Sequence, residues 1–583
     1  MIKSDIDILS EYYQHELSYL RSAGKDFAQR FPKIARRLDL SSNESSDPHV
    51  ERLIESFAFL TGKLQKQIDD QFPEIAQTLL DIIYQPLTLP TPSCVLVNFT
   101  VDQSRAMKAP GVVVPQSTSL HIQSHSGEIC QFMTSHDLQI WPLEITEASV
   151  ITKEQLPSYY ARSIHYLKIG IKGNSTQISP KNLKFYLLAN ALLKGKIFAT
   201  IFSTEECVLL QKNDRYTQLA TAKPIGIDDN QSLFLYPQTV HKGFRLLHEY
   251  FAFPDKFHGF EVHFPQNLDL AGDNFLYIPL GSDIAMEISE KNFSISSVPA
   301  VNLFHKVTEP LRLDQRQVEY CLVPDYRLYN TNEIYTIEKI VAVDSENNDE
   351  IYIPEFFSCD YCMDNKIFWK SRRKKSHLPI GEDVFVSFVD MDFNPQYPAD
   401  KIFYGYSLCT NRGAAEQIPA NGELQIELSI PVKNIYCVDR PTAQKPSPKS
   451  GEILWKLISA LSLNSISFSN DGIKKIREVL RTFANITGSS LEREIDAISS
   501  VSSELTTRRI DEQCWRGFVR GTRIEITFDD TIQNLGLPLS LVLSKFLASY
   551  NSISTFTDVE VKSIIKNGII KKWNHQVGIK NYL

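Results

Sequence analysis

Residues 45–60 read SSDPHVERLIESFAFL, and this stretch decides how the chain begins to fold. Asp47 is a good N-cap because its carboxylate accepts an orphan backbone N–H, and Pro48 suits the first helical position, where no N–H is needed. His49 and Glu51 then lie in the first turn, on the polar side. A helix that packs against another element is therefore favoured over a metal ligand beside a general base. Apolar residues recur at steps of three and four on one helical face: Val50, Leu53, Ile54, Phe57, Leu60, Leu64 and Ile68.

The composition is that of a globular protein. With 583 residues, 43% hydrophobic and 22% charged, the chain is long enough for about three or four domains. The net charge of −8 makes nucleic acid a poor partner, because binding it requires dense positive charge. The opening residues lack the apolar run of a signal peptide, and no stretch approaches the ~20 apolar residues that span a bilayer. Nine scattered cysteines favour a reducing cytoplasm.

The periodicity predicts an α+β multidomain protein that begins with a helical segment over residues 1–90. Ser10 is expected to cap a first helix whose apolar face carries Tyr13, Leu17, Leu20 and Phe27. Pro32 and Pro73 interrupt the helical pattern. The Pro-spaced stretch Gln85–Ser93 reads as a stiff linker that leads from helix to strand.

Strand signals then dominate as far as about residue 440. We expect two β-rich domains, 91–300 and 301–440, because the region is too long for one and has few convincing long helices. Pro441–Gly451 is a second Pro/Ser linker. The last part, 441–583, is predicted to be an α+β domain. In it a helix over Leu539–Tyr550 separates strands at Arg523–Phe528 and Phe556–Val561.

The search for chemical motifs finds no catalytic, cofactor-binding or metal site. The sequence contains no Walker-type phosphate loop and no G-x-S-x-G elbow. Cys359 and Cys362 have C-x-x-C spacing, but further soft ligands are far along the chain, so chance spacing is the better interpretation. His121 and His125 fall on an alternating strand, where residues four apart are too distant to chelate one ion easily. We therefore predict a protein that is not an enzyme and needs no cofactor.

Several motifs, in order along nearly the whole chain, resemble the TssF family of the bacterial type VI secretion system. The first are the opening helices, EYYQHELSYLRSAGKDFAQRFPKIARRLDL and the stretch from SSDPHVERLIESFAFL to DIIY. The rest are GFRLLHEYFAFPDKF (Gly243–Phe257), PAVNLFHKVTEPL (Pro299–Leu311), LCTNR (Leu408–Arg412), LISALSLNSISF (Leu457–Phe468) and GFVRGTRIEI (Gly517–Ile526) followed by KFLASYNSISTF. The sequence departs from the family pattern after LCTNR, at 413–416, where a Leu-Pro pair is more usual.

The resemblance implies a structural, non-enzymatic subunit of the baseplate of a phage tail-like contractile injection system. Two copies of the chain are expected to wrap one TssG as a wedge, and six wedges to surround the VgrG spike. TssK would tether the wedge to the membrane complex, and TssE would help to start the sheath. The protein is then expected in the cytoplasm, docked through the secretion complex at the inner face of the inner membrane.

A helical bundle shared with partner chains is what the resemblance implies for the apolar stripe of the first paragraph. The expected partner-binding residues are Tyr13, Leu17, Leu20, Phe27, Val50, Leu53, Phe57, Leu60, Leu64 and Ile68. The alternative is a β-rich carbohydrate-binding or hydrolytic protein, which would need carboxylates clustered in a groove.

Overall fold

A computed structural model describes most of the chain. The residues outside the description are 1–4, 32, 35–47, 72, 103–110, 125–126, 158–161, 175–177, 214, 237–241, 267, 283–286, 314–316, 345–349, 357–366, 379–380, 391–400, 449–450, 463–471, 488–490, 513–514, 530–535, 549–554, 565–567 and 578–583. The chain divides into two compact units. A helical unit contains Met1–Thr88 and Pro448–Ser462, and a β-rich unit contains Leu89–Ser447 and Leu463–Leu583.

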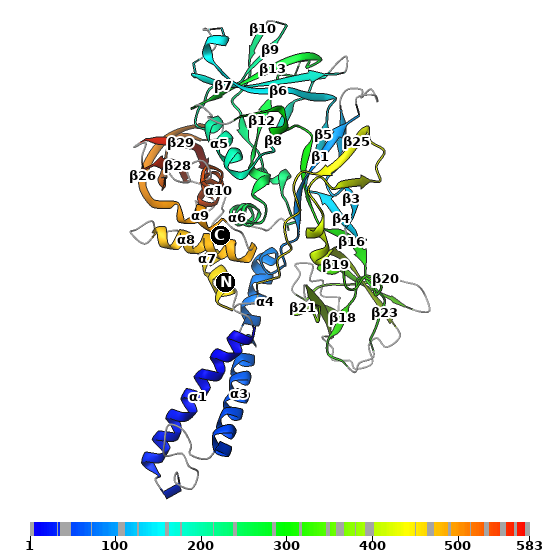
Figure 1. The fold of residues 1–583 in the computed structure, drawn as a ribbon, viewed down its shortest axis with the longest axis vertical. Helices are drawn as coiled ribbons and strands as arrows, with labels where there is room; N and C mark the ends of the chain where they lie inside the picture. Colours follow the sequence, from blue (N-terminus) through cyan, green and yellow to red (C-terminus); the bar gives the residue numbers. More distant parts are fainter. Residues whose placement is uncertain are drawn as a thin grey trace. The chain divides into compact units, whose positions relative to one another are not determined.

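Two helix pairs make up the helical unit. Its elements are α1 (Asp5–Arg30), α3 (Pro48–Gln71), α4 (Pro73–Tyr84), the short 3-10 helix η1 (Gln85–Leu87) and α7 (Gly451–Ser462). Helix α1 packs along α3 as a hairpin, and α4 packs on α7 (Figure 1). The expected cap at Ser10 is wrong, because α1 already begins at Asp5. Ile6 and Leu9 carry the apolar spacing of Tyr13 upstream of Ser10. Asp47, the expected cap of α3, lies outside the described residues.

A closed barrel is the first part of the β-rich unit. Its strand order is β1–β15–β4–β3–β24–β25, and its interior holds Phe99, Leu120 and Phe132. The strands span Cys94–Val101 (β1), Ser119–Gln123 (β3), Ile129–Thr134 (β4), Ser297–Val301 (β15), Glu423–Ile426 (β24) and Val432–Cys437 (β25). Strand β1 pairs with β25, so residues far apart in the sequence share one barrel. A separate two-stranded sheet joins β2 (Val112–Val114) and β5 (Leu138–Ile140).

Two further sheets follow in the segment between β5 and β15. The first has the order β10–β9–β13–β7–β6, with strands Arg215–Gln218, Leu209–Lys212, Gly272–Leu280, His165–Gly173 and Leu143–Thr152. The second has the order β11–β12–β8–β14, with strands Lys223–Pro224, Gly259–His263, Asn182–Leu187 and Phe293–Ser294. The helices in this segment are α5 (Ala191–Phe202), α6 (Lys242–Ala252) and the short η2 (Lys153–Gln155), η3 (Asp229–Gln231), η4 (Pro254–Phe257) and η5 (Glu290–Asn292).

Between β15 and β24 the chain forms two antiparallel sheets around a shared core that includes Trp369, Val386 and Phe403. One has the order β16–β23–β19–β20, with β17 also on β23; the strands are Phe304–Val307, Lys401–Thr410, Glu333–Asp344, Glu350–Ile353 and Leu311–Arg312. The other has the order β18–β22–β21, with strands Tyr320–Leu322, Glu382–Asp390 and Ile367–Lys375. The short η6 (Arg412–Gln417) then leads to β24.

The C-terminal part is an α+β module. Its sheet has the order β26–β27–β28–β29, with strands Ile498–Glu512, Trp515–Phe528, Phe556–Ser563 and Ile569–Val577. Strands β27 and β28 run parallel and are joined through α10 (Gly536–Ala548), which is the expected strand–helix–strand order. The other helices are α8 (Gly472–Thr487) and α9 (Glu492–Asp496). Phe244 of α6 contacts Phe483 of α8 and Phe546 of α10, and these rings join the module to the rest of the β-rich unit.

The α+β multidomain class expected from the sequence is confirmed, with helices first, strands in the middle and both at the end. The four-part division at residues 90, 300 and 440 stays a prediction. Both Pro-rich linkers lie where the chain passes between the two units, since the division falls at Thr88–Leu89 and at Ser447–Pro448.

Candidate partner-binding surface

Helix α3 uses its small residues to pack against α1. Ala58 is fully buried, and a Cβ on Gly62 would lie 3.1 Å from the backbone nitrogen of Tyr13, so the two helices approach closely there. An ion pair between Arg21 of α1 and Glu51 of α3 ties the hairpin together near the start of α3. Glu51, which the sequence placed among polar first-turn residues, thus links the two helices.

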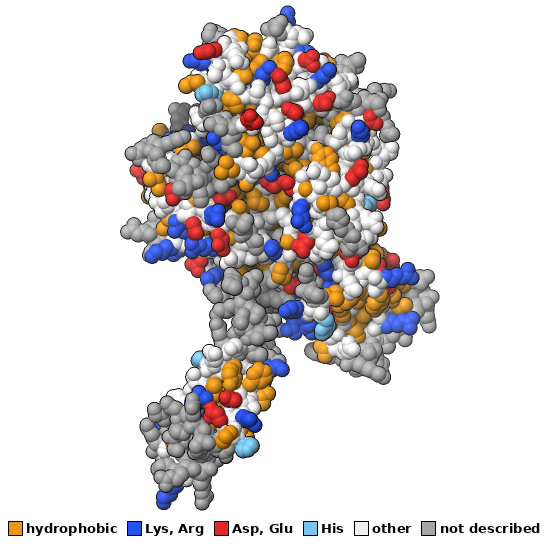
Figure 2. Space-filling view, viewed as in Figure 1, with side chains coloured by type: hydrophobic (Ala, Val, Ile, Leu, Met, Phe, Trp, Pro, Cys, Tyr) orange, Lys and Arg blue, Asp and Glu red, His pale blue; other side chains and the backbone are white. Residues whose placement is uncertain are grey.

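The apolar stripe of α3 lies on the opposite side of the helix. At 100° per residue, the four residues 53, 57, 60 and 64 fall within about 60° of one another and about 180° from Gly62. Their exposed fractions are 71% for Leu53, 54% for Phe57, 57% for Leu60 and 57% for Leu64. Apolar side chains accordingly cover part of the visible surface of this hairpin (Figure 2). Such a stripe is larger than a solvated helix needs, and it is typical of a surface that another chain covers.

The residues predicted to bind partners therefore divide into two groups. Tyr13, Leu17, Leu20 and Phe27 of α1 are half-buried, and the backbone at Tyr13 lies against α3 of the same chain. The four described members on α3 are exposed. The side chains of Val50 and Ile68 lie outside the description. Partner binding by either group stays a prediction, but only the α3 group is largely open to solvent.

A second exposed apolar face, on α4, was not predicted. Ile75, Leu79, Ile82 and Ile83 are exposed, with fractions between 39% and 62%. The opposite side of α4, with Ala76, Leu80 and Tyr84, is buried, and α7 contributes the buried Leu454 and Leu457 to the same helix pair. The signal was available in the sequence, because PEIAQTLLDIIY has apolar residues at three–four spacing on both sides of the helix.

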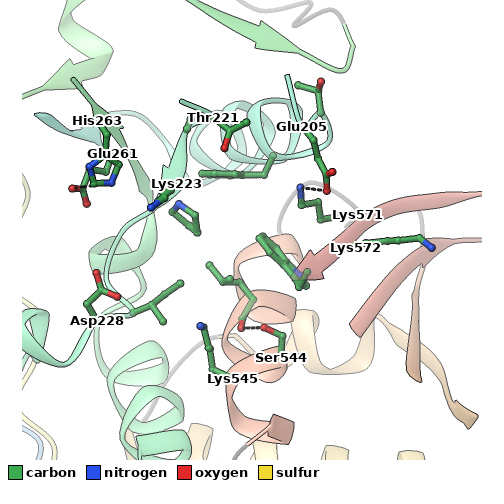
Figure 3. A pocket seen from close by; sticks show the side chains of 17 residues that line it. Glu205, Thr221, Lys223, Asp228, Glu261, His263, Ser544, Lys545, Lys571 and Lys572 are labelled. Atoms are coloured by element: carbon green, nitrogen blue, oxygen red, sulfur yellow. Dashed lines mark hydrogen bonds and ion pairs between the residues drawn. The ribbon is translucent and has the colours of Figure 1, made fainter. Parts of the chain in front are cut away.

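The β-rich unit contains a polar cavity of about 550 Å³ beside α10 and β29 (Figure 3). Several of its charged side chains already have partners within the chain. Lys571 lies 3.5 Å from Glu205, Lys572 lies 2.8 Å from Glu560, and Glu261 accepts a hydrogen bond from Asn182. Burial lowers the pKa of Lys571 below its usual range, and it does the same for Lys545. The Ser544 hydroxyl donates to the Leu541 carbonyl at 2.7 Å, so its hydrogen bond is made within α10.

Three buried thiols are poor nucleophiles. Burial raises the pKa of Cys130, Cys409 and Cys437 to about 12, so each remains a protonated thiol near neutral pH. Cys359, Cys362 and His125 lie outside the described residues. His121 sits on β3, 3.3 Å from Glu427. In the described part of the chain, no group of three His, Cys, Asp or Glu side chains is placed to hold a metal ion. Among the same residues, no helix is long and apolar enough to cross a membrane.

A β-rich body with internally paired charges, joined to helices with uncovered apolar faces, is typical of a structural subunit of a larger assembly. Comparison with known proteins agrees. The sequence model described as "Type VI secretion system, TssF" matches residues 6–580, and the chain belongs to this family. The type VI secretion system component TssF1 of Pseudomonas aeruginosa is 28% identical over 616 aligned residues, which cover 98% of each chain.

Two solved structures share the fold. A chain of the TssK–TssF–TssG baseplate subcomplex of the type VI secretion system, determined by cryo-electron microscopy, superposes with a TM-score of 0.70 at 19% identity. The match covers 92% of this chain and 99% of that one. A chain of the baseplate complex from the type VI secretion system gives a TM-score of 0.58 at 20% identity, covering 98% of this chain and all of the other. The resemblance noted in the sequence is thereby confirmed.

Proposed function

We propose that this chain forms a wedge of the type VI secretion baseplate together with TssG and a second copy of itself. Its role as a structural baseplate subunit follows from membership of the TssF family and from the two baseplate structures with the same fold. One of those structures joins TssK, TssF and TssG, which supports TssG and TssK as direct partners here. Two copies per TssG, six wedges around the VgrG spike and a link to TssE complete the proposal.

The exposed stripe of α3 is the observation that carries this proposal. Its four apolar residues face away from the close α1–α3 contact at Gly62, so the fold of the chain itself does not bury them. Helices with a strict three–four apolar repeat pack in bundles by fitting side chains into the facing helix. We infer that α3 supplies this face to helices of TssG and of the second copy.

The proposed role needs no catalysis. The cavity beside α10 contains paired charges, and burial holds the thiols of Cys130, Cys409 and Cys437 protonated. A hydrolytic protein would instead need two carboxylates available across a groove, whereas Glu205 and Glu261 of this cavity are each engaged by a neighbouring side chain. We therefore infer a non-enzymatic subunit that works on the cytoplasmic side of the inner membrane, where the secretion complex docks.

Co-expression with TssG tests the proposal. The chain alone should aggregate, since its apolar stripes are uncovered, and the co-expressed proteins should elute as a complex with two copies of this chain per TssG. Phe57→Asp should abolish that complex, because an unpaired charge in an apolar seam is costly. Ser56→Asp is the matched control: it adds the same charge to the neighbouring exposed position of α3 and should leave the complex intact. A monodisperse monomer, or a complex with Phe57→Asp, would overturn the assignment.

A further inference from the structure

The two Pro-rich segments that connect the β-rich unit to the helical unit run side by side. Thr91 and Lys445 exchange both backbone hydrogen bonds, at 2.9 and 3.0 Å. Farther into the unit, the Thr442 amide donates to the Cys94 carbonyl at 2.9 Å, and the Thr442 hydroxyl accepts from the Cys94 amide at 2.9 Å. The outgoing and returning segments therefore form a short antiparallel ladder.

Two buried carboxylates hold the returning segment from its other side. Glu333, at the start of β19, accepts a hydrogen bond from the side-chain amide of Gln444 at 2.8 Å. Glu382, at the start of β22, accepts the Ser447 hydroxyl, which lies 2.7 and 2.8 Å from its two oxygens. The two carboxylates are connected, because Glu333 also accepts from the backbone amide of Glu382 at 3.0 Å. Both are almost completely buried, at 1% and 2% exposure.

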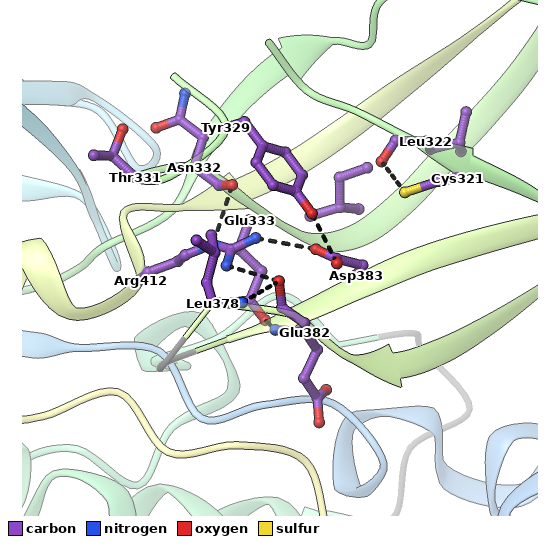
Figure 4. A network of polar contacts seen from close by, with 12 residues as sticks. Cys321, Leu322, Tyr329, Thr331, Asn332, Glu333, Leu378, Glu382, Asp383 and Arg412 are labelled. Carbon is purple, nitrogen blue, oxygen red and sulfur yellow. Dashed lines mark hydrogen bonds and ion pairs between the residues drawn. The ribbon is translucent and has the colours of Figure 1, made fainter. Parts of the chain in front are cut away.

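Arg412 of the LCTNR motif fixes the strands that carry these carboxylates. Its guanidinium donates to the Asn332 carbonyl at 3.3 Å and to Asp383 at 3.2 Å, next to Glu333 and Glu382 respectively (Figure 4). Asp383 also accepts from the Tyr329 hydroxyl at 2.8 Å. Arg412 itself has φ +48°, a conformation that costs energy for a residue with a side chain and is kept only where its surroundings impose it.

Gly381 shows how tightly the cluster is packed. It has φ +105°, and a Cβ there would lie 2.8 Å from Glu333 Oε2 and 3.0 Å from Arg412 Nη1. Arg373 adds a second guanidinium, 4.0 Å from Glu382. Three carboxylates and two guanidiniums share this buried site, and burial keeps the pKa of Glu333 above its usual range. Such a cluster is expensive to build, so a purely apolar core would serve stability at least as well.

We propose that Glu333 and Glu382 are positioning residues, which clamp the returning segment 441–447 onto the outgoing segment 89–94. The clamp fixes the place at which both segments leave the β-rich unit. The clamp consists of contacts within the β-rich unit and does not depend on the proposed function.

Hydrogen exchange of the full-length chain, purified with a solubility tag, tests the clamp without any partner. Ser447→Ala removes only the hydroxyl that Glu382 binds. The amides of Thr91, Thr442 and Lys445 should then exchange about tenfold faster, because a hydrogen bond to a charged group is lost. Ser447→Thr keeps the hydroxyl and should restore slow exchange.

Ser544→Ala is the matched control, since it removes another buried hydroxyl, in α10, that does not touch the linker. Its linker amides should exchange as in the wild type. Should Ser447→Ala also leave all three amides unchanged, the clamp is refuted. Co-purification with TssG is a separate readout: failure of the wild-type chain to bind TssG removes the proposed function, whereas accelerated exchange supports the clamp in either case.

Discussion

The two units of this protein differ in which side chains they expose and which they bury. On α3 of the helical unit, apolar side chains are left in water. In the β-rich unit, charges are taken out of water: Lys256 and Glu249 form an ion pair with side chains that are 1% and 0% exposed. The buried charges are satisfied within the chain, because Glu249 also accepts the Leu233 amide at 2.9 Å. The β-rich unit thus satisfies these buried charges within the chain, whereas α3 leaves apolar side chains exposed that we propose other chains cover.

The largest expected effect is on the buried ion pair. Glu249→Ala leaves Lys256 uncompensated inside the unit, although burial already lowers the pKa of that amine. The free energy of unfolding should fall by about 3–5 kcal/mol, measured by urea denaturation. The control is Asp496→Ala in the exposed pair with Arg481, at 2.7 Å, which should cost less than about 1 kcal/mol. Equal losses from the two variants would mean that the β-rich unit does not depend on its internal pairing.

The next effect depends on pH. Burial raises the pKa of Glu494, beside the Tyr250 hydroxyl, to about 7 from an ordinary value of 4.5. Its contribution to stability is therefore full below pH 4.5 and is lost as the pH rises through 7. The glutamine of Glu494→Gln stays neutral at every pH. At pH 8 the free energy of unfolding of this variant should exceed that of the wild type by up to about 3 kcal/mol, and at pH 4.5 the two values should be close. Parallel pH profiles, or the same change from the exposed Glu492→Gln, would contradict this.

A substitution in the stripe of α3 should affect partner binding more than stability. Leu60→Ala removes an exposed side chain, so the unfolding free energy of the chain, kept in solution by a solubility tag, should move by less than about 0.5 kcal/mol. Association with TssG should weaken by about 2 kcal/mol, roughly thirtyfold, if the side chain is buried in the bundle. Binding is best followed by titration of tagged TssG. A stability loss without a binding loss would mean that Leu60 packs within its own chain. The helical unit would then not differ from the β-rich unit in leaving apolar side chains for a partner.

The smallest effect is expected at His49. It is exposed in the first turn of α3, one turn before Leu53. His49→Ala should leave TssG binding and secretion-dependent killing within twofold of the wild type, because a surface substitution changes little. A strong loss would revive the reading of His49 and Glu51 as a chemical pair.

Local patterns predicted what depends on local geometry. The three–four spacing from Leu53 to Leu64 gave the outward face of α3, and the alternation in Arg523–Phe528 gave part of β27. The pairing of β1 with β15 and β25 could not be predicted, because the residue pattern of a strand does not indicate which distant strand it pairs with. The helix start at Asp5 was missed because Ser10 has the side chain of a cap inside a pattern that continues upstream of it.

The buried charges were equally out of reach. Glu249 and Lys256 lie in GFRLLHEYFAFPDKF, where they read as ordinary polar residues of a helix and a turn. Their pairing depends on α6 and η4 folding back on one another, which charge and spacing do not reveal. The α4 face was missed for a different reason. Its apolar residues surround the helix, and only the position of α7 decides which of them are covered.

The ladder between Thr91 and Lys445 has a consequence for the order in which the protein is made. Helix α4 leaves the ribosome early, but α7, which covers its buried side, is synthesised only after the barrel strands are complete. Cys94 and Thr442 are 348 residues apart, a loop that an unfolded chain would close at a large entropic cost. Once the β-rich unit has folded, its two ends are already neighbours, and α7 meets α4 as if they were adjacent in the sequence. The pairing of α4 with α7 therefore depends on the folding of the β-rich segment that connects them.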